Sequence, residues 1–148
     1  MNNNQMEILL VEDNPDDAKI ISRAFEKYEI NELCKIHIAR DGVEALQYIF
    51  GDSGEENNVL AHHPLLILLD LNIPKLHGLE VLKKVKSHEV AKEIPVVVLT
   101  ASDKKTDWIN AHSFGADSYI QKSSDYRQYV DAAGWAILGA VNEKKFHR

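Results

Sequence analysis

Five short apolar runs are separated along the chain by longer segments with helical spacing of apolar residues. The runs occupy residues 8–11, 36–39, 65–69, 96–99 and 119–120. The third and fourth are apolar at every position, which is typical of strands buried on both faces of a parallel sheet. This alternation predicts an α/β fold of the doubly wound type, with a five-stranded parallel sheet covered by helices on both faces.

The segments between the runs carry the end signals of helices. Asn14 can cap the first helix, Pro15 fits its first turn, and Asp16 and Asp17 suit its positive end. Further helices are predicted over residues 43–50, 79–87, 104–114 and from 125 to about 145. We expect one domain over residues 1–148, with an extended C-terminal helix and a long loop at about 51–64. That loop is either functional or a tolerated insertion.

Composition narrows the class of protein. The chain has 148 residues and a net charge of -6, which argues against nucleic acid as a partner because phosphate backbones are bound by clustered lysine and arginine. The longest apolar run is far too short to span a bilayer, and the N-terminus lacks the pattern of a signal peptide. The single cysteine, Cys34, cannot form an intramolecular disulfide. We therefore expect a cytoplasmic protein without a membrane segment.

Acidic residues follow two of the predicted strands. Glu12 and Asp13 come directly after the first, and Asp70 comes after the third. The ends of parallel strands meet at one edge of the sheet, so these side chains should share a crevice at the switch in strand order. Crowded carboxylates repel one another unless a cation lies between them. Oxygen ligands of this kind favour Mg²⁺, for which Mn²⁺ can substitute.

Two more polar residues end the remaining strands of the predicted sheet. Thr100 follows the fourth and offers a hydroxyl, and Lys122 follows the fifth and offers an ammonium suited to phosphate. A carboxylate nucleophile, a cation site, a hydroxyl and an ammonium together make a constellation for phosphoryl transfer.

With these motifs in place, the sequence resembles the receiver domain of two-component response regulators, a CheY-like family with a flavodoxin-like fold. The likeness extends from residue 8 to about 141. Its motifs are Val11-Glu12-Asp13, Leu69-Asp70-Leu71-Asn72-Ile73-Pro74 with Gly78, Val98-Leu99-Thr100-Ala101 and Tyr119-Ile120-Gln121-Lys122.

The resemblance implies a role for each residue of the acidic motifs. Asp70 resembles the aspartate that accepts the phosphoryl group. Asp13 resembles the direct Mg²⁺ ligand, with Glu12 acting through water, and the backbone carbonyl of Asn72 would complete the protein's share of the coordination.

The remaining motifs imply a switch. Thr100 would bond to the phosphoryl group and Lys122 would pair with it, while the small Ala101 leaves room for a donor. Tyr119 occupies the place of the switch aromatic, which turns inward as Thr100 moves. A static surface tyrosine is the alternative at this position.

One position departs from the family. Ser123 follows Lys122 where the family usually has a proline in a cis bond, and a non-proline cis bond costs about 2.5–4 kcal/mol. We nevertheless expect Lys122 to reach the site.

The resemblance implies a signalling protein rather than an enzyme. A histidine kinase would supply the phosphoryl group, and the domain would support only slow phosphorylation and dephosphorylation of its own. The long loop and extended last helix resemble single-domain regulators paired with bacterial phytochrome kinases. No output domain is expected after residue 141, so the output would be protein–protein contact or phosphate relay.

The last predicted helix carries an apolar residue on its outer side. Tyr126, Tyr129, Val130, Ala133, Ile137 and Val141 share one face, which we expect to be the core face. Trp135 then points away from the core, among small residues that include Ala132 and Gly139. A large aromatic among small outward residues suggests a homodimer packed through this helix. The alternatives are a docking face for a kinase or a lone exposed tryptophan.

Three other functions fit the sequence less well. A haloacid-dehalogenase-like phosphatase would need a second aspartate where Asn72 stands. A nucleotide-binding domain would need a glycine-rich loop where the chain has Glu12-Asp13-Asn14-Pro15. The third is an adaptor that keeps the fold but is never phosphorylated, against which the complete acidic set argues.

Overall fold

A computed structural model describes residues 5–52, 54–56 and 58–146. Positions 53 and 57 of the predicted long loop and both ends of the chain lie outside the described residues. The strands are β1 (Met6–Val11), β2 (Cys34–Ala39), β3 (Leu66–Asp70), β4 (Val96–Thr100) and β5 (Ser118–Gln121). The α-helices are α1 (Pro15–Lys27), α2 (Gly42–Phe50), α3 (Gly78–Ser87), α4 (Lys105–Ser113) and α5 (Tyr126–Phe146).

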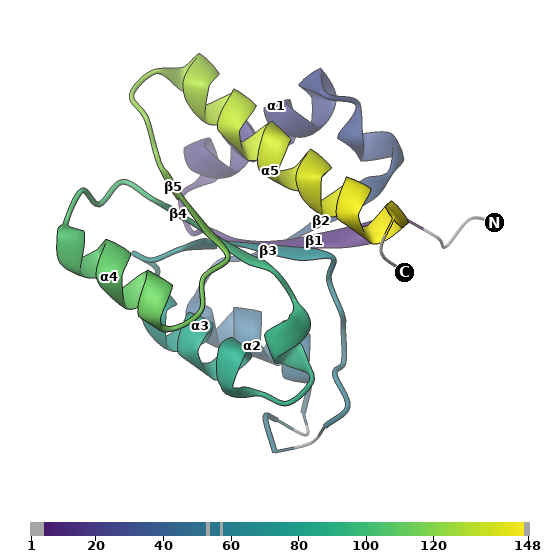
Figure 1. Ribbon diagram of the computed structural model, residues 1–148, viewed down its shortest axis with the longest axis vertical. Helices are drawn as coiled ribbons and strands as arrows, with labels where there is room; N and C mark the ends of the chain where they lie inside the picture. The colour runs from purple at the N-terminus through teal and green to yellow at the C-terminus, as the bar shows by residue number, and fades with distance from the viewer. Residues whose placement is uncertain (1–4, 53, 57, 147–148) are drawn as a thin grey trace.

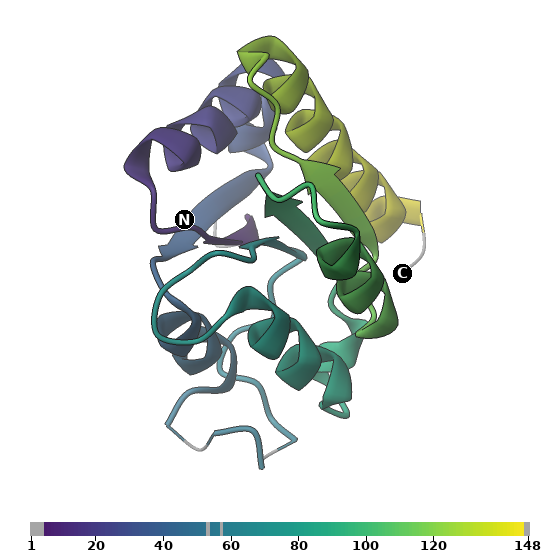
Figure 2. The same ribbon diagram turned by 90° about the vertical axis from the view of Figure 1, so that its left-hand side faces the viewer.

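The strands form one sheet in the order β2-β1-β3-β4-β5, and each neighbouring pair is parallel. Helices α1 and α5 cover one face of this sheet, and α2, α3 and α4 cover the other (Figure 1). The view turned by 90° shows the same three layers (Figure 2). The predicted doubly wound α/β fold is confirmed, and the switch in strand order lies between β1 and β3.

The sheet divides the hydrophobic core in two, because successive side chains of a strand point to opposite faces. In β1, Leu9 and Val11 join the core beneath α2 and α3, whereas Ile8 and Leu10 join the core beneath α1 and α5. Strands β3 and β4 are buried along their whole length. This double burial is the reason that their sequences read as unbroken apolar runs.

The helix ends follow local signals in the sequence. The side chain of Asn14 accepts hydrogen bonds from the backbone N–H of Asp16 at 2.8 Å and of Asp17 at 3.3 Å, as expected of a helix cap. Helix α5 runs to residue 146, close to its predicted end. None of the helices in the described part of the chain combines the length and apolar character needed to cross a bilayer.

The expectation that Tyr126 lies on the core face of α5 is wrong. Its side chain is exposed at the first residue of the helix, and the guanidinium of Arg23 lies over its ring at 5.6 Å from the centroid. At the first residue of the helix the ring faces Arg23 of α1 and does not enter the core. Tyr129, Val130, Ala133, Ile137 and Val141 are buried as predicted.

Gly78 fixes the loop that follows β3. A Cβ atom at this position would lie 2.5 Å from Leu71 Cα and 2.6 Å from the carbonyl oxygen of Asp70. The Gly78 N–H also donates to the Leu71 carbonyl at 2.9 Å. The start of α3 therefore packs directly on the backbone of the strand end that carries Asp70, and only glycine permits this approach.

We expect Gly78→Ala to lower the free energy of unfolding by about 1–3 kcal/mol, because the backbone atoms facing the new methyl group cannot move aside without strain. Urea denaturation followed by circular dichroism measures this change. Gly139→Ala is the matched control, since a Cβ there meets no atom within 4 Å. In the middle of a helix this control should raise stability by about 0.5–1 kcal/mol. Equal effects of the two substitutions would contradict the packing argument.

Candidate functional site

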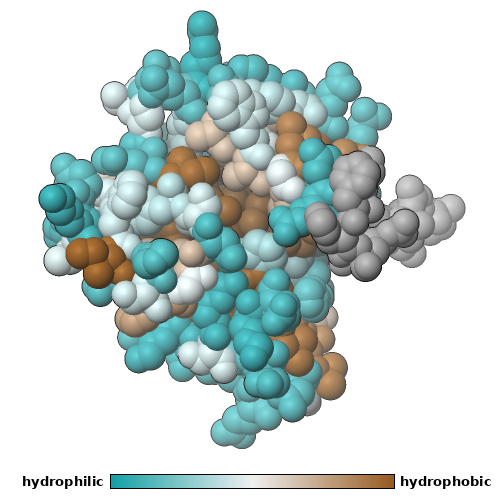
Figure 3. All heavy atoms as spheres, in the orientation of Figure 1, coloured by the Kyte–Doolittle hydropathy of each residue, from teal (hydrophilic) through white to brown (hydrophobic). Residues whose placement is uncertain are grey.

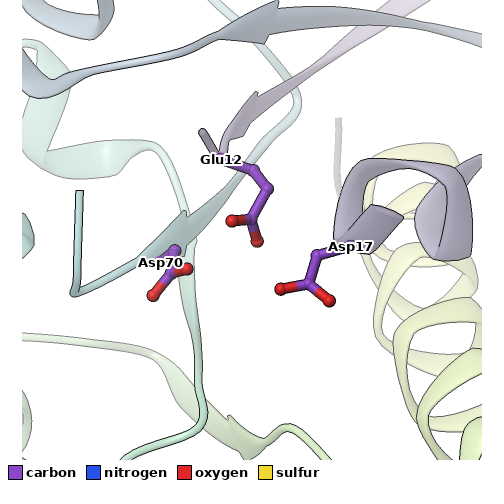
Figure 4. Close-up of side chains that lie close together, drawn as sticks. All are labelled: Glu12, Asp17 and Asp70. Atoms are coloured by element: carbon purple, nitrogen blue, oxygen red, sulfur yellow. The ribbon is translucent and has the colours of Figure 1, made fainter. Parts of the chain in front are cut away.

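Three carboxylates meet at the edge where β1 and β3 end. Glu12 follows β1, Asp70 ends β3, and Asp17 lies in the first turn of α1. One oxygen of each lies within 4.8 Å of the others. Figure 4 shows the three side chains pointing toward one another across the gap between the strand ends and the helix. The parallel sheet sets this geometry, because it brings the ends of neighbouring strands to the same edge.

The ammonium of Lys122 binds all three carboxylates. Its Nζ atom lies 2.8 Å from Glu12 Oε1, 2.7 Å from Asp17 Oδ2 and 2.8 Å from Asp70 Oδ2. The lysine reaches the site from the loop after β5, where its N–H donates to the Thr100 carbonyl at 2.7 Å. An ammonium has three N–H donors, and here each has a carboxylate acceptor.

The peptide bond between Lys122 and Ser123 is trans, as are the other bonds of the described residues. Serine in place of the family's usual proline therefore coexists with a lysine side chain that points into the acidic group.

Burial and the neighbouring charges change the pKa values of Glu12 and Lys122. Burial raises the pKa of the Glu12 carboxyl from its ordinary 4.5 to about 7, the neighbouring Asp70 adds to this effect, and Lys122 opposes it. Burial alone would lower the pKa of Lys122, but its hydrogen bonds to the three carboxylates raise it above the ordinary value. The lysine thus stays charged, and Glu12 takes up a proton near neutrality.

The second oxygens of the carboxylates have different partners. Glu12 Oε2 accepts from the N–H of Asn14 at 3.3 Å, and Asp70 Oδ1 accepts from the N–H of Asn72 at 3.0 Å. Asp17 receives a side-chain hydrogen bond from Lys122 alone among the described residues. Glu12 and Asp70 are thus held at both oxygens, whereas Asp17 depends on the lysine.

A hydroxyl and an aromatic ring lie beside this group along β4 and β5. Thr100 is fully buried at the end of β4, and its Oγ1 accepts from the Ser102 N–H at 3.3 Å. The half-buried Tyr119 donates from its hydroxyl to the Ser102 carbonyl at 3.3 Å. Its ring packs on that of Trp108 in α4, with centroids 4.6 Å apart. Both side chains therefore contact the same loop, between β4 and α4.

The structure brings together part of the predicted site. Glu12, Asp70 and Lys122 are in contact as the sequence suggested, with Asn72 bonded through its backbone to Asp70. Asp13 is exposed and does not belong to the group of three carboxylates. Ala101 is exposed beside Thr100.

Asp17 was missed as a member of the site. Its position in the first turn of a helix was sufficient explanation for an acidic residue. The available signal was that this turn begins directly after β1, at the same edge of the sheet as Asp70.

The donor set fits a small divalent cation. Carboxylate oxygens are the ligands that Mg²⁺, Mn²⁺ and Ca²⁺ share, and three of them converge here from separate elements. The exposed Asp13 lies at the same edge of the sheet, beside the buried Glu12.

The motif resemblance is confirmed by comparison with known families and proteins. The family model described as the response regulator receiver domain matches residues 8–133. Response regulator Rcp1 of Synechocystis sp. is 37% identical over 120 residues, which cover 81% of this chain and 78% of the relative.

Solved structures agree in fold. The phosphorylated cyanobacterial phytochrome response regulator RcpA superposes with a TM-score of 0.78 at 36% identity, covering 89% of this chain and 91% of that one. The Mn²⁺-bound form of Rcp1 gives a TM-score of 0.76 at 35% identity, covering 88% and 90%. The same fold is thus known in a phosphorylated state and with a bound cation.

The raised pKa of Glu12 predicts how stability depends on pH in metal-free buffer. Between pH 4.5 and about 7 the folded protein holds a proton on Glu12 that the unfolded chain has lost. Stability contributed by this group is therefore complete below pH 4.5 and declines as the pH rises to about 7. The decline attributable to Glu12 is on the order of 3 kcal/mol.

Glu12→Gln should remove that part of the decline, because glutamine stays neutral across the range. Urea denaturation at a series of pH values with a chelator present measures it. Glu26→Gln, an exposed position on α1, is the control and should leave the decline in place. An unchanged slope in Glu12→Gln would show that Glu12 is ionised throughout the range.

Proposed function

This chain belongs to the family of response regulator receiver domains, and on that premise we propose that it is a signalling switch phosphorylated on Asp70 by a histidine kinase. The observation that carries the proposal is the contact between Asp70 and Lys122 at 2.8 Å, in a group that also contains Glu12. This contact supports the proposal, because a nucleophile, a cationic partner for the phosphoryl oxygens and a metal ligand would then share one site.

In the proposed reaction an oxygen of Asp70 attacks the phosphorus of a phosphohistidine. The new P–O bond forms as the P–N bond breaks, and the electron pair of the broken bond stays on the histidine nitrogen, which takes a proton. The N–H of Asn72 holds the other Asp70 oxygen at 3.0 Å and so orients the carboxylate. Lys122 moves from the carboxylates toward the phosphoryl oxygens, whose charge it balances.

Mg²⁺, or Mn²⁺ in its place, would be held by Glu12, Asp13, Asp70 and the carbonyl of Asn72, and when bound it neutralises charge on the transferred group. Without a kinase, the same residues would support slow phosphorylation from small donors and slow dephosphorylation.

The response to phosphorylation would pass through Thr100 and Tyr119. A phosphoryl group on Asp70 offers acceptor oxygens to the Thr100 hydroxyl, which now lies buried beside the Ser102 N–H. Moving Thr100 disturbs the loop that Tyr119 holds through the Ser102 carbonyl. The tyrosine ring would then turn inward, and the surface of α4 and β5 around Trp108 would change. Ala101 leaves the approach to Asp70 open.

The similar proteins indicate which kind of kinase this chain would work with. RcpA is a cyanobacterial phytochrome response regulator, and we propose a phytochrome-type histidine kinase for this chain as well. The protein would then act in the cytoplasm, where such a kinase presents its phosphohistidine. With a net charge of -6, its own output would be contact with proteins and not with nucleic acid.

We also propose a homodimer through α5. Trp135 is 67% exposed on this helix, the largest exposure among the aromatic residues described on it. Gly139, one turn further, is exposed with open space around it, and Ala132 is half-buried. Pale and brown side chains, neutral to hydrophobic in the colour scale, gather along α5 in the upper part of Figure 3. A second copy of the helix could place its Trp135 against these small residues.

Incubation with acetyl phosphate and Mg²⁺ tests the phosphorylation site. We expect intact-mass spectrometry to show the addition of one phosphoryl group to the wild type and none to Asp70→Asn, because the amide is a poor nucleophile. Chelating the Mg²⁺ should abolish the addition. A gain of mass in Asp70→Asn would place the modification elsewhere, and no gain in the wild type, even from a cognate kinase, would favour the adaptor.

Sedimentation equilibrium tests the dimer. We expect a dimer that Trp135→Ala weakens by about 30-fold or more, as for a central interface aromatic. Trp108→Ala removes an exposed tryptophan from α4 instead and should leave the association unchanged. A wild type that stays monomeric both with and without phosphorylation would rule out the dimer.

A further inference from the structure

The hydroxyl of Tyr129 is buried without a hydrogen-bond partner. Tyr129 lies in the first turns of α5 and is 2% exposed, and its hydroxyl oxygen is the one buried side-chain polar atom of the described residues left unsatisfied. A phenylalanine would fill the same space without this cost, since an unpaired buried hydroxyl destabilises the fold. We therefore expect the Tyr129 hydroxyl to have a hydrogen-bond partner in another state of the protein.

Tyr129 belongs to the core layer that supports the acidic group. Its ring packs in the same hydrophobic cluster as Ile21 of α1, and Asp17 lies one turn before Ile21 on the same face of that helix. Helices α1 and α5 run side by side over this face of the sheet in both views (Figures 1 and 2). Burial raises the pKa of Tyr129, and the charges of Lys122, Glu12, Asp17 and Asp70 also act on it. The hydroxyl is thus within electrostatic reach of the site.

The contacts of Lys122 explain why the Tyr129 hydroxyl is not bonded to the acidic group. All three N–H donors of its ammonium are taken by carboxylates. Glu12 and Asp70 each have a backbone N–H on their second oxygen. Among the described residues, Lys122 is the one hydrogen-bond donor to the Asp17 carboxylate, so Asp17 is the carboxylate left without a protein donor when the lysine turns to a phosphoryl group.

We propose that Tyr129 is a positioning residue whose hydroxyl donates a hydrogen bond to Asp17 when Lys122 leaves that carboxylate for the phosphoryl group on Asp70. The inference rests on the proposed function and adds a residue to it. A buried donor is unsatisfied in the resting state and becomes satisfied in the phosphorylated one, and this difference favours the phosphorylated state. The bond is charge-assisted, which makes it stronger than one between neutral groups.

Beryllofluoride, which mimics a phosphoryl group on a carboxylate, provides the test. Calorimetric titration at saturating Mg²⁺ gives its affinity for the wild type and for Tyr129→Phe, and thermal unfolding without ligand gives their stability. We expect Tyr129→Phe to bind beryllofluoride about tenfold more weakly and to unfold about 2–4 °C higher. A purely structural tyrosine would not produce these opposite changes.

Two further variants identify the partner and exclude a general effect of losing a tyrosine hydroxyl. The double-mutant cycle with Asp17→Ala should show that Tyr129→Phe has no further effect on affinity once Asp17 is absent. Tyr48→Phe removes a hydroxyl bonded to Glu7, away from the acidic group, and should leave the affinity for beryllofluoride unchanged.

The outcomes separate this inference from the function on which it rests. Wild type that binds beryllofluoride with the same affinity as Tyr129→Phe overturns the role of Tyr129 and leaves the phosphorylation site intact. Additive effects of Tyr129→Phe and Asp17→Ala overturn Asp17 as the partner. Wild type that binds no beryllofluoride in the presence of Mg²⁺ overturns the phosphoryl site and this inference together.

Discussion

The site depends on a single ammonium placed among three carboxylates. Glu12, Asp17 and Asp70 lie close enough to repel one another strongly, and two of them are buried. Lys122 compensates by giving one hydrogen bond to each. A buried charge group of this kind adds little to stability, since an apolar replacement of similar volume is often as stable. Three distant segments, β1 with α1, β3 and the loop after β5, converge on this lysine.

The arrangement makes the site sensitive to any competing charge. Lys122 has no spare donor, so a new anion on Asp70 can bind it only by taking it from a carboxylate. The cost of that exchange depends on which other groups can replace the lysine. Backbone N–H groups already serve Glu12 and Asp70, and among the described residues the hydroxyl of Tyr129 is the buried side-chain donor left unsatisfied. In the proposed switch, residues that never contact the phosphoryl group would therefore help to set the equilibrium between the two states.

The sequence predicted the fold well because the physical signals were strong. Strands β3 and β4 are buried on both faces, which leaves no polar position to obscure the pattern. Polar residues at strand ends identified Glu12, Asp70 and Lys122, since parallel strands must end at one edge. The details of the site were harder. The presence of an acidic residue at Asp17 is explained by the positive end of a helix, and the presence of an aromatic ring at Tyr129 is explained by the core. Neither residue therefore stood out in the sequence. Which of Glu12 and Asp13 points inward depends on the path of the chain as β1 ends, which periodicity does not encode.

The glycine contact at the start of α3 has a consequence for the direction in which a signal can travel. Gly78 packs on the backbone of Asp70 and Leu71, and Gly42 approaches the Leu76 carbonyl so closely that neither position has room for a Cβ atom. On the opposite flank of Asp70, beyond its pairing with β4, lie the hydrogen bonds around Ser102 and the tilted rings of Tyr119 and Trp108. If Asp70 is phosphorylated as proposed, the closely packed backbone on the α3 side would favour a rearrangement on the other side of Asp70, toward α4 and β5.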